Sequence, residues 1–246
     1  MEENTIRSAA RAFSLLETLA ERGEMGVTEL SVAVCLNKTT VFRQIGALIS
    51  MGYVKKNAET DKYRLTFKLL ELAGNLLTQI DMRMIARPHL VNLAATSGET
   101  VHLVQRDGAH IVYIDKVEPT VNSVRMVSRV GYRQPVYCTA VGKVILADLS
   151  DQEIEEVWNV SSIHSLTEHT IVDFDQFMIE IHEIRRRGYA LDREENEIGV
   201  CCIAVSLNQY TGIANHAISV SFPKSRITSE RIEITANALL DIKSKL

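Results

Sequence analysis

The densest group of chemically distinctive side chains lies between residues 36 and 64. This stretch holds six Lys and Arg residues against two acidic residues, in a chain whose net charge is −4. Cations concentrated in one segment of an otherwise acidic protein are typical of a surface that contacts nucleic-acid phosphates. The segment also carries side chains that bind base edges, because arginine pairs with guanine, glutamine with adenine, and threonine with a base edge or the thymine methyl group. The candidates for DNA contact are Lys38, Thr39, Thr40, Arg43, Gln44, Lys55, Lys56, Lys62 and Arg64.

A second group, of small polar side chains, lies on two strand-like segments near the C-terminus. Alternation in ANHAISVSFP places Ser219 and Ser221 on the face opposite the large apolar residues, and Cys202 lies similarly in GVCCIAVSL. An apolar strand with small hydrogen-bonding groups on one face suits the wall of a pocket for a small carboxylate or hydroxy acid. The alternative is that both serines face water on an edge strand.

Catalytic, metal and redox signatures are weak in this sequence. His164 and His169 are five residues apart, which is not the four-residue spacing of a metal-binding helix face, and the chain has no GxSxG, Gly-rich phosphate loop or CxxC. We therefore expect no metal, no cofactor and no enzymatic activity. A redox-sensing binding module using Cys201 and Cys202 stays as an alternative, although a disulfide between adjacent cysteines is strained.

The elements that position the basic group are three short helices and a hairpin. Apolar spacing predicts helices over residues 7–21, 28–34 and 38–50; Thr28 is the N-cap candidate of the second, and Asn37 that of the third. The segments YVKK and KYRL then flank a polar turn, as in a β-hairpin. Two short helices followed by a hairpin predict a helix-turn-helix with a wing. The alternative is a packing or dimerisation unit whose polar face is merely solvated.

The rest of the chain predicts a second domain of a different kind. Residues 66–80 form a helix that is apolar on more than one side, which indicates a linker that also contributes to a dimer contact. Hairpin-like strands and helices follow in separate runs, so we expect an α+β fold with an antiparallel sheet. The predicted domains are residues 1–66, a linker helix over residues 67–81, and residues 82–246.

Residues 7–73 resemble the winged helix-turn-helix domain of the IclR family of bacterial transcriptional regulators. One position departs from the family pattern, because Cys35 stands where the turn between the helices usually has glycine. A non-glycine residue in the left-handed conformation costs about 1–2 kcal/mol. The turn is therefore either slightly strained or shaped differently in this chain.

Two later segments, VGYRQPVYCTAVGKVILA and RGYALDREENEIGVCCIAV, resemble the family's effector domain. The resemblance implies a GAF-like antiparallel sheet that binds a small molecule. It also implies that Ala140 and Val141 offer backbone amides to a ligand carboxylate. The effector-binding positions that the family implies are Met126, Ala140, Val141, Asp192, Cys202, Ser219 and Ser221.

The chain departs from one pattern within the family at Ser123 and Gln134, where leucine is replaced by a polar residue. Polar replacements suit a larger and more hydroxylated ligand, and the sequence resembles the sugar-acid-responsive branch of the family. We therefore expect a sugar acid or keto acid as effector. Asp192 would repel such an anion unless it accepts hydrogen bonds from ligand hydroxyls, is protonated, or pairs with a cation such as Arg193.

The composition agrees with a regulator inside the cell. With 46% hydrophobic and 24% charged residues the chain is typical of globular proteins, no apolar run is long enough to span a bilayer, and four unevenly placed cysteines suggest a reduced, cytoplasmic protein. We expect a homodimer or homotetramer that binds a double-stranded DNA operator and regulates a carbohydrate or sugar-acid catabolic operon. A repressor is favoured, although the family includes activators. The alternative is a metabolic enzyme whose N-terminal helices serve dimerisation.

Overall fold

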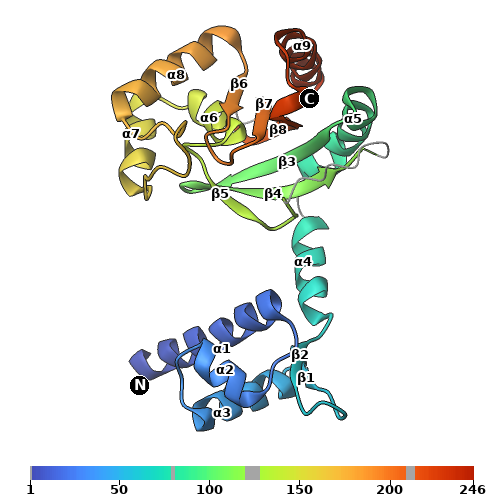
Figure 1. Cartoon of the computed structure of the whole chain (residues 1–246), viewed down its shortest axis with the longest axis vertical. Coiled ribbons are helices and arrows are strands. Elements are labelled where there is room, and N and C mark those ends of the chain that lie inside the picture. The colour runs from blue at the N-terminus through green and yellow to red at the C-terminus, as the bar shows by residue number, and fades with distance from the viewer. Residues whose placement is uncertain (1, 79–80, 120–127, 209–213) are drawn as a thin grey trace. The chain divides into compact units, whose positions relative to one another are not determined.

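The computed structural model describes residues 2–78, 81–119, 128–208 and 214–246 of the 246-residue chain. The chain forms two compact units, Met1–Gln79 and Ile80–Leu246, each with its own core (Figure 1). The division between the units falls inside the segment 67–81 that the sequence predicts as a linker helix. The predicted Met126 and Ser123 lie outside the described residues. The sequence also predicts a strand over residues 121–130, and most of that segment is not described either.

The N-terminal unit consists of helices packed against a short hairpin. Its elements are α1 (Glu2–Arg22), α2 (Val27–Ala33), α3 (Lys38–Ser50), β1 (Val54–Lys56), β2 (Tyr63–Leu65) and α4 (Lys68–Thr78). Apolar residues of α1, α2, α3 and the hairpin form one core, in which Leu15, Leu30 and Val41 are fully buried. The predicted helix-turn-helix with its wing is confirmed.

The ends of α3 follow from two residues. Asn37 is its N-cap, and the Asn37 Oδ1 accepts a hydrogen bond from the Thr40 backbone amide at 2.7 Å. After the helix, Gly52 adopts a φ of 80°, which glycine reaches without steric cost. The Thr28 prediction is wrong: α2 begins at Val27 with Gly26 as N-cap, because the Glu29 carboxylate accepts from the Gly26 amide at 2.7 Å.

The backbone at Cys35 distinguishes between the two alternatives for the turn, a strained left-handed residue or a different shape. Its φ is 52°, so the backbone keeps the left-handed conformation without glycine. The turn is thus mildly strained rather than reshaped.

The second unit is a six-stranded antiparallel sheet covered by helices. The order of strands is β5-β4-β3-β8-β7-β6, which confirms the predicted antiparallel α+β fold. Its elements are α5 (Asp81–Ser97), β3 (Thr100–Asp107), β4 (His110–Val117), β5 (Arg133–Pro135), α6 (Ala140–Ala147), α7 (Asp151–Val160), α8 (Phe174–Arg187), β6 (Ala190–Arg193), β7 (Val200–Asn208), β8 (Ala214–Pro223), the 3-10 turn η1 (Lys224–Arg226) and α9 (Ser229–Lys245).

Helices α6, α7 and α8 share a core with one face of this sheet, which includes Ala204 of β7 and Ala217 of β8. Strand alternation turns Ile203 and Ile218 to the opposite face, and α5 and α9 contact β3 and β7 (Figure 1). The sequence also predicts the starts of α7 and α8, because Ser150 and Glu153 have the spacing of a capping box and Asp173 is a favoured N-cap type. Both predictions are confirmed.

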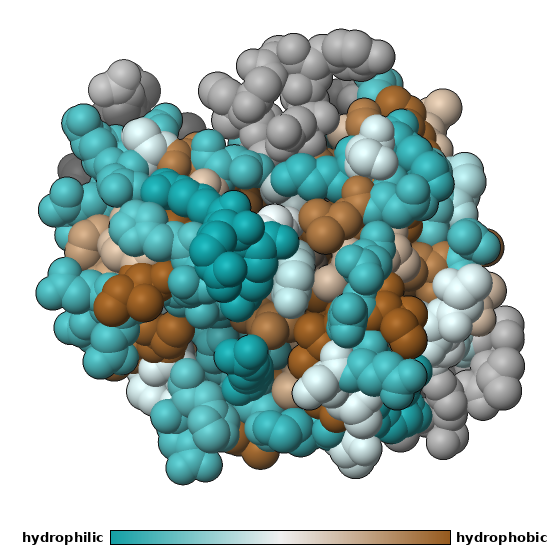
Figure 2. Space-filling view, turned by 90° about the horizontal axis from the view of Figure 1, so that it is seen from above, coloured by the Kyte–Doolittle hydropathy of each residue, from teal (hydrophilic) through white to brown (hydrophobic). Residues whose placement is uncertain are grey.

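The exposed surface is mixed. Figure 2 shows a face on which polar residues predominate and apolar residues form separate patches. Among the helices in the described ranges, none is both long and apolar enough to cross a membrane.

Candidate functional site

The predicted DNA-contact residues of α3 divide into exposed and buried ones. Lys38, Thr39 and Arg43 are exposed, and Thr40 is half-buried beside its capping partner. Gln44 is only 6% exposed, and its Nε2 donates to Ser8 Oγ on α1 at 2.9 Å. The predicted position of Gln44 on the exposed face is therefore wrong.

The phase of the helix explains where Gln44 lies. It follows Val41 by three residues and precedes Leu48 by four, so it shares their buried face. The spacing of eight residues from Val41 also predicts that Ile49 is buried, and this prediction is wrong because Ile49 is 40% exposed. The interior side of α3 thus consists of Val41, Gln44, Ile45 and Leu48.

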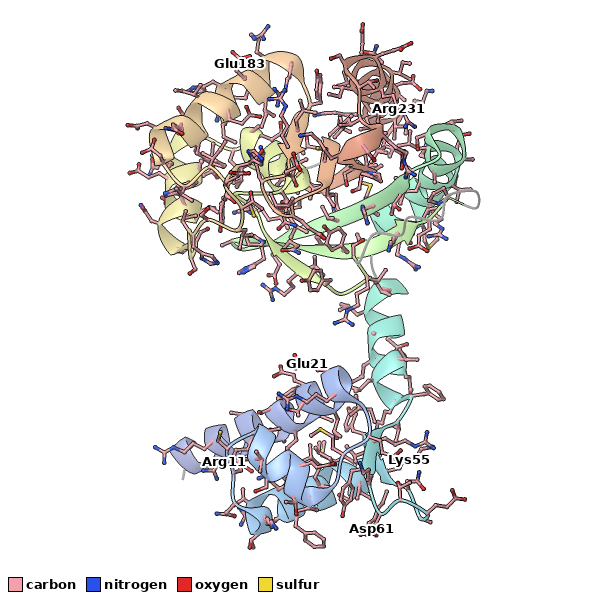
Figure 3. The ribbon with its side chains drawn as sticks, viewed as in Figure 1. Arg11, Glu21, Lys55, Asp61, Glu183 and Arg231 are labelled. Carbon is pink, nitrogen blue, oxygen red and sulfur yellow. The ribbon has the colours of Figure 1, made fainter. Side chains whose placement is uncertain are left out.

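The four predicted cations of the wing differ in their partners. Lys55 on β1, labelled in Figure 3, and Arg64 on β2 are paired across the hairpin, and both are exposed. Neither forms an ion pair with any residue that the structure describes. Lys56 pairs with Asp61, and Lys62 Nζ lies 3.4 Å from Glu29 Oε1. Lys55 and Arg64 are therefore the cations most available to phosphates.

The predicted effector residues meet in one cavity of about 300 Å³ in the second unit. Six of the seven line it, from α6, β6, β7 and β8; the seventh, Met126, is not described. Gln134 on β5, which was singled out for its polarity, also lines the cavity. The two serines are 3% and 4% exposed, so the edge-strand alternative is wrong for them. The predicted residues in the wall are Ala140, Val141, Asp192, Cys202, Ser219 and Ser221.

The N-terminus of α6 forms one end of this cavity. Thr139 caps the helix, and its Oγ1 accepts from the Gly142 amide at 3.2 Å. The first amides of a helix have no partner within it, and Ala140 and Val141 both line the cavity. Gly142 is required there because a Cβ would lie 2.2 Å from the Val136 carbonyl oxygen. The helix end therefore offers the cavity donors and a positive dipole end.

A chain of hydrogen bonds joins four of the residues that line the cavity. Cys202 Sγ and Ser221 Oγ are 3.1 Å apart, Ser221 Oγ and His102 Nδ1 are 3.3 Å apart, and His102 Nε2 and Ser128 Oγ are 2.7 Å apart. Burial, assisted by the cation of Lys116, lowers the pKa of His102 to about 3. The neutral imidazole therefore donates through one ring nitrogen and accepts through the other.

Asp192 is buried in the same wall. Its Oδ1 accepts from the Glu195 amide at 2.8 Å. Burial, together with the negative charge of Glu195, raises the pKa of Asp192 to about 7. Arg193 is exposed and makes no ion pair with Asp192 in the part of the chain that the structure covers. Of the three ways to place an anion beside Asp192, protonation and hydroxyl contacts agree with this geometry, and pairing with Arg193 does not.

A fully buried ion pair holds the loop beside Asp192. The ammonium of Lys143 on α6 pairs with the Glu195 carboxylate and lies 3.9 Å from Glu180 Oε1. Because Lys143 follows the helix end at the cavity and Glu195 binds Asp192, the pair joins two walls of the cavity. Buried charges persist only when paired in this way.

Sequence reasoning missed several residues of the wall. His102 was available from the alternation argument, since it lies between two apolar strand residues. That His102 lies beside Ser219 of β8 could not be predicted, because the pairing of β3 with β8 joins segments more than a hundred residues apart. The additional lining residues are His102, Tyr113, Ser128, Tyr132, Thr139, Asn196, Glu197 and Val200.

The rival chemistries find little support. Cys201 and Cys202 are free and point to opposite faces of β7, and burial raises the pKa of both thiols, which opposes redox reactivity. Within the described ranges, no cluster of three His, Cys, Asp or Glu residues could hold a metal ion.

Comparison with known proteins gives a consistent result. Residues 8–58 match the IclR helix-turn-helix domain, and residues 74–246 match the C-terminal domain of the bacterial transcriptional regulator IclR. The chain is 36% identical over 232 residues to the HTH-type transcriptional regulator KdgR of Escherichia coli (strain K12), covering 94% of this chain and 88% of that protein. It is 35% identical over 224 residues to the DNA-binding transcriptional repressor YiaJ of the same organism, covering 90% and 79%.

A solved structure extends the match to three dimensions. The crystal structure of Thermotoga maritima IclR superposes with a TM-score of 0.83 at 33% identity, covering 98% of this chain and 99% of that one. These proteins are regulators, so the alternative of a metabolic enzyme is not supported.

Proposed function

The chain belongs to the IclR family of bacterial transcriptional regulators, and we propose that it is a repressor of carbohydrate or sugar-acid catabolism that releases its operator when a hydroxylated acid binds. It is a DNA-binding protein that responds to a small-molecule effector, and not an enzyme. The names of its relatives support the sign of regulation, since YiaJ is a repressor.

The observation that carries the effector class is the lining of the cavity. Hydroxyl groups from Ser219, Ser221 and Ser128 converge there with the imidazole of His102. No Lys or Arg lines it among the residues that the structure describes. A ligand carboxylate would therefore be met by the amides of the α6 N-terminus, and its hydroxyls by the serines and Asp192. A cavity of about 300 Å³ suits a metabolite of a few carbon atoms.

The proposed effector site comprises the six predicted residues that line the cavity. Met126, the seventh, stays a prediction because it lies outside the described residues. Gln134 adds an amide that suits a hydroxylated ligand better than leucine would. A sugar acid fits this combination through its carboxylate and its several hydroxyl groups, and a keto acid fits through its carboxylate and a keto oxygen that accepts hydrogen bonds.

The proposed DNA interface comprises the exposed end of α3 and the wing. Arg43 and Thr39 would contact base edges, and Lys55 and Arg64 would contact phosphates. Lys38, Thr40, Lys56 and Lys62 complete the interface, the last two with acidic neighbours already in place. Gln44 is left out because its amide is buried and bound to Ser8.

We further propose that the protein is a homodimer or homotetramer in the bacterial cytoplasm. The helix α4 supports self-association, because Leu70, Leu72 and Leu76 on it are more than half exposed. Two copies would place two α3 helices in successive major grooves about 34 Å apart. Residues 1–66 would then bind DNA, residues 67–81 would connect the two domains, and residues 82–246 would bind the effector.

The test combines an operator with a panel of acids. Duplexes that bind the full-length protein are selected from a random-sequence library, and their affinity is measured with hexuronates, aldonates, keto-deoxy acids and aromatic acids. We expect one hydroxylated acid to weaken operator binding by at least about fivefold, the usual lower range of allosteric coupling.

The variant Ser219→Ala/Ser221→Ala should lose this response and keep its operator affinity without effector. Ser244→Ala on the exposed face of α9 is the matched control and should respond normally. A response only to aromatic acids, or an unchanged response in the double variant, would refute the proposed effector site.

A further inference from the structure

The exposed face of α3 carries a phenylalanine that neither the core nor the predicted interface uses. Phe42 is 65% exposed, although the helix already buries Val41, Gln44, Ile45 and Leu48 against the rest of the unit. A single exposed apolar residue is common on protein surfaces. Phe42, however, lies on the side of α3 that carries the residues proposed to contact DNA bases.

Phe42 lies in a stripe of exposed residues, which we call the reading stripe: Thr39, Phe42, Arg43 and Gly46. Their spacing of i, i+3, i+4 and i+7 places them on one side of the helix. Recognition helices that read base edges in the major groove use this same spacing. Phe42 is thus flanked by the two side chains best suited to contact bases, Thr39 and Arg43.

The last member of the stripe leaves room beside the ring. Gly46 lies one turn after Phe42, and a Cβ at Gly46 would meet no atom within 4 Å. The helix therefore presents a bare backbone next to the phenyl ring, with nothing of its own to cover the ring. A base pair can approach this part of the helix more closely than it could approach a longer side chain.

Apart from Thr39, whose methyl group is small, the polar side chains of the reading stripe are not suited to recognise an A·T pair. Arg43 suits guanine, whereas the amide of Gln44, which could have paired with adenine, is bound to Ser8 inside the unit. In the major groove an A·T pair is also distinguished by the thymine methyl group, and phenylalanine is one of the side chains that contact it. The exposed ring supplies the apolar surface that such a contact needs.

We infer, on the basis of the DNA-binding function proposed above, that Phe42 contacts a thymine methyl group in each half of the operator and so determines part of the sequence preference. The contact excludes water from the methyl group and from one face of the ring. It involves no phosphate, so it contributes to sequence preference and not to the salt dependence of binding.

The experiment removes the methyl group from the DNA and the ring from the protein. Each thymine of the duplex selected by the wild-type protein is replaced in turn by uracil, which keeps base pairing and lacks only the methyl group. Affinities of the wild-type protein and of Phe42→Ala are measured at one salt concentration.

We expect uracil at one position of a half-site to weaken the wild-type protein about fourfold, the effect of exposing one methyl group. The same replacement should leave the affinity of Phe42→Ala unchanged. Phe42→Ala should bind the thymine duplex at least about fourfold more weakly than wild type, with the same dependence on salt. Ile179→Ala, which trims a similarly exposed apolar side chain on α8 of the second unit, should bind as wild type does.

Three results would overturn the inference. Uracil could weaken both proteins equally, Phe42→Ala could bind the thymine duplex as well as wild type, or Phe42→Ala could change the oligomeric state, which would make the ring a contact between copies of the chain. A failure of the proposed function itself is recognised separately, since the wild-type protein would then select no preferred sequence, and Arg43→Ala would have no preference to lose.

Discussion

Two lysines illustrate how differently the two units use the same chemistry. Lys55 on the hairpin (labelled in Figure 3) is exposed and has no ion pair among the described residues, whereas Lys143 on α6 is fully buried and paired with Glu195. An exposed cation contributes little to stability and stays available to an outside anion. A buried cation must be matched inside the fold, so it holds structure together and cannot bind a ligand phosphate. Lys55 thus stays available to DNA, whereas Lys143 serves to hold two walls of the cavity together.

The largest expected effect tests whether the buried charges are matched. Replacing Lys143 with methionine leaves the Glu195 carboxylate buried without its partner, and we expect the free energy of unfolding to fall by about 3–5 kcal/mol. Chemical denaturation monitored by the fluorescence of Trp158, in the second unit, measures this loss.

The double variant Lys143→Met/Glu195→Leu is the control, because it removes both charges together. It should recover most of the stability, since a buried pair can be replaced by apolar side chains at little cost. Equal stability of Lys143→Met and the wild type would show that the pair does not hold the two walls together.

The next effect concerns pH and the carboxyl group of Asp192. Its pKa is raised to about 7 in the folded protein and is about 3.9 in an unfolded chain. The folded state therefore binds more protons between these values, so this group stabilises the fold most at low pH, and the contribution disappears as the pH rises through 7. The free energies of unfolding of Asp192→Asn and of the wild type, compared at pH 5 and at pH 8, isolate the contribution of this carboxyl group.

We expect the stability difference between wild type and Asp192→Asn to change by about 2–3 kcal/mol between these two pH values, in favour of the wild type at pH 5. His102, whose pKa is lowered to about 3, acts in the opposite direction and is almost entirely neutral at pH 8 in both states. It is present in both proteins and cancels in the difference. A difference that does not change with pH would mean that Asp192 stays ionised in the fold.

A smaller effect separates two neighbours on α3. Arg43→Ala should lose about ten- to a hundredfold in affinity for the selected operator, with non-specific binding and stability nearly unchanged. Gln44→Ala should do the reverse: its hydrogen bond to Ser8 is lost, and the fold weakens by about 1 kcal/mol, while the folded protein keeps its sequence preference. If Gln44→Ala lost its sequence preference but kept its free energy of unfolding, Gln44 would have to contact DNA after all.

The smallest effect lies in the wing. Lys55→Ala should weaken binding to all duplexes alike and reduce the slope of log affinity against log salt by about one, because one phosphate contact is lost. Lys62→Ala is the matched comparison, since Lys62 already pairs with Glu29, and its slope should change less. A preference lost for one sequence only would mean that Lys55 contacts a base.

Local sequence signals predicted most of the fold. Asn37 and Gly52 mark the ends of α3, Ser150 with Glu153 starts α7, and Asp173 starts α8, because caps act within a few residues of the helix end. The alternation in β8 likewise placed Ser219 and Ser221 on the cavity wall. These signals depend only on neighbours along the chain.

Contacts between distant segments could not be predicted in the same way. The position of Gln44 depends on Ser8, 36 residues earlier, and a polar residue at the edge of a helical stripe fits either face. His102 meets Ser221 only because β3 pairs with β8, 119 residues later in the sequence. Lys143 gave no signal either, since its partner Glu195 comes from a loop that no local pattern locates.

The geometry at Gly142 restricts how the cavity can change during evolution. Any side chain there would collide with the Val136 carbonyl oxygen and push the helix end away from the ligand. Lineages that acquire a new effector can exchange wall residues such as Gln134 or Cys202 one at a time, whereas this glycine must stay in place. Across homologues that respond to unrelated metabolites, we therefore expect Gly142 to be retained while the side chains around it diverge.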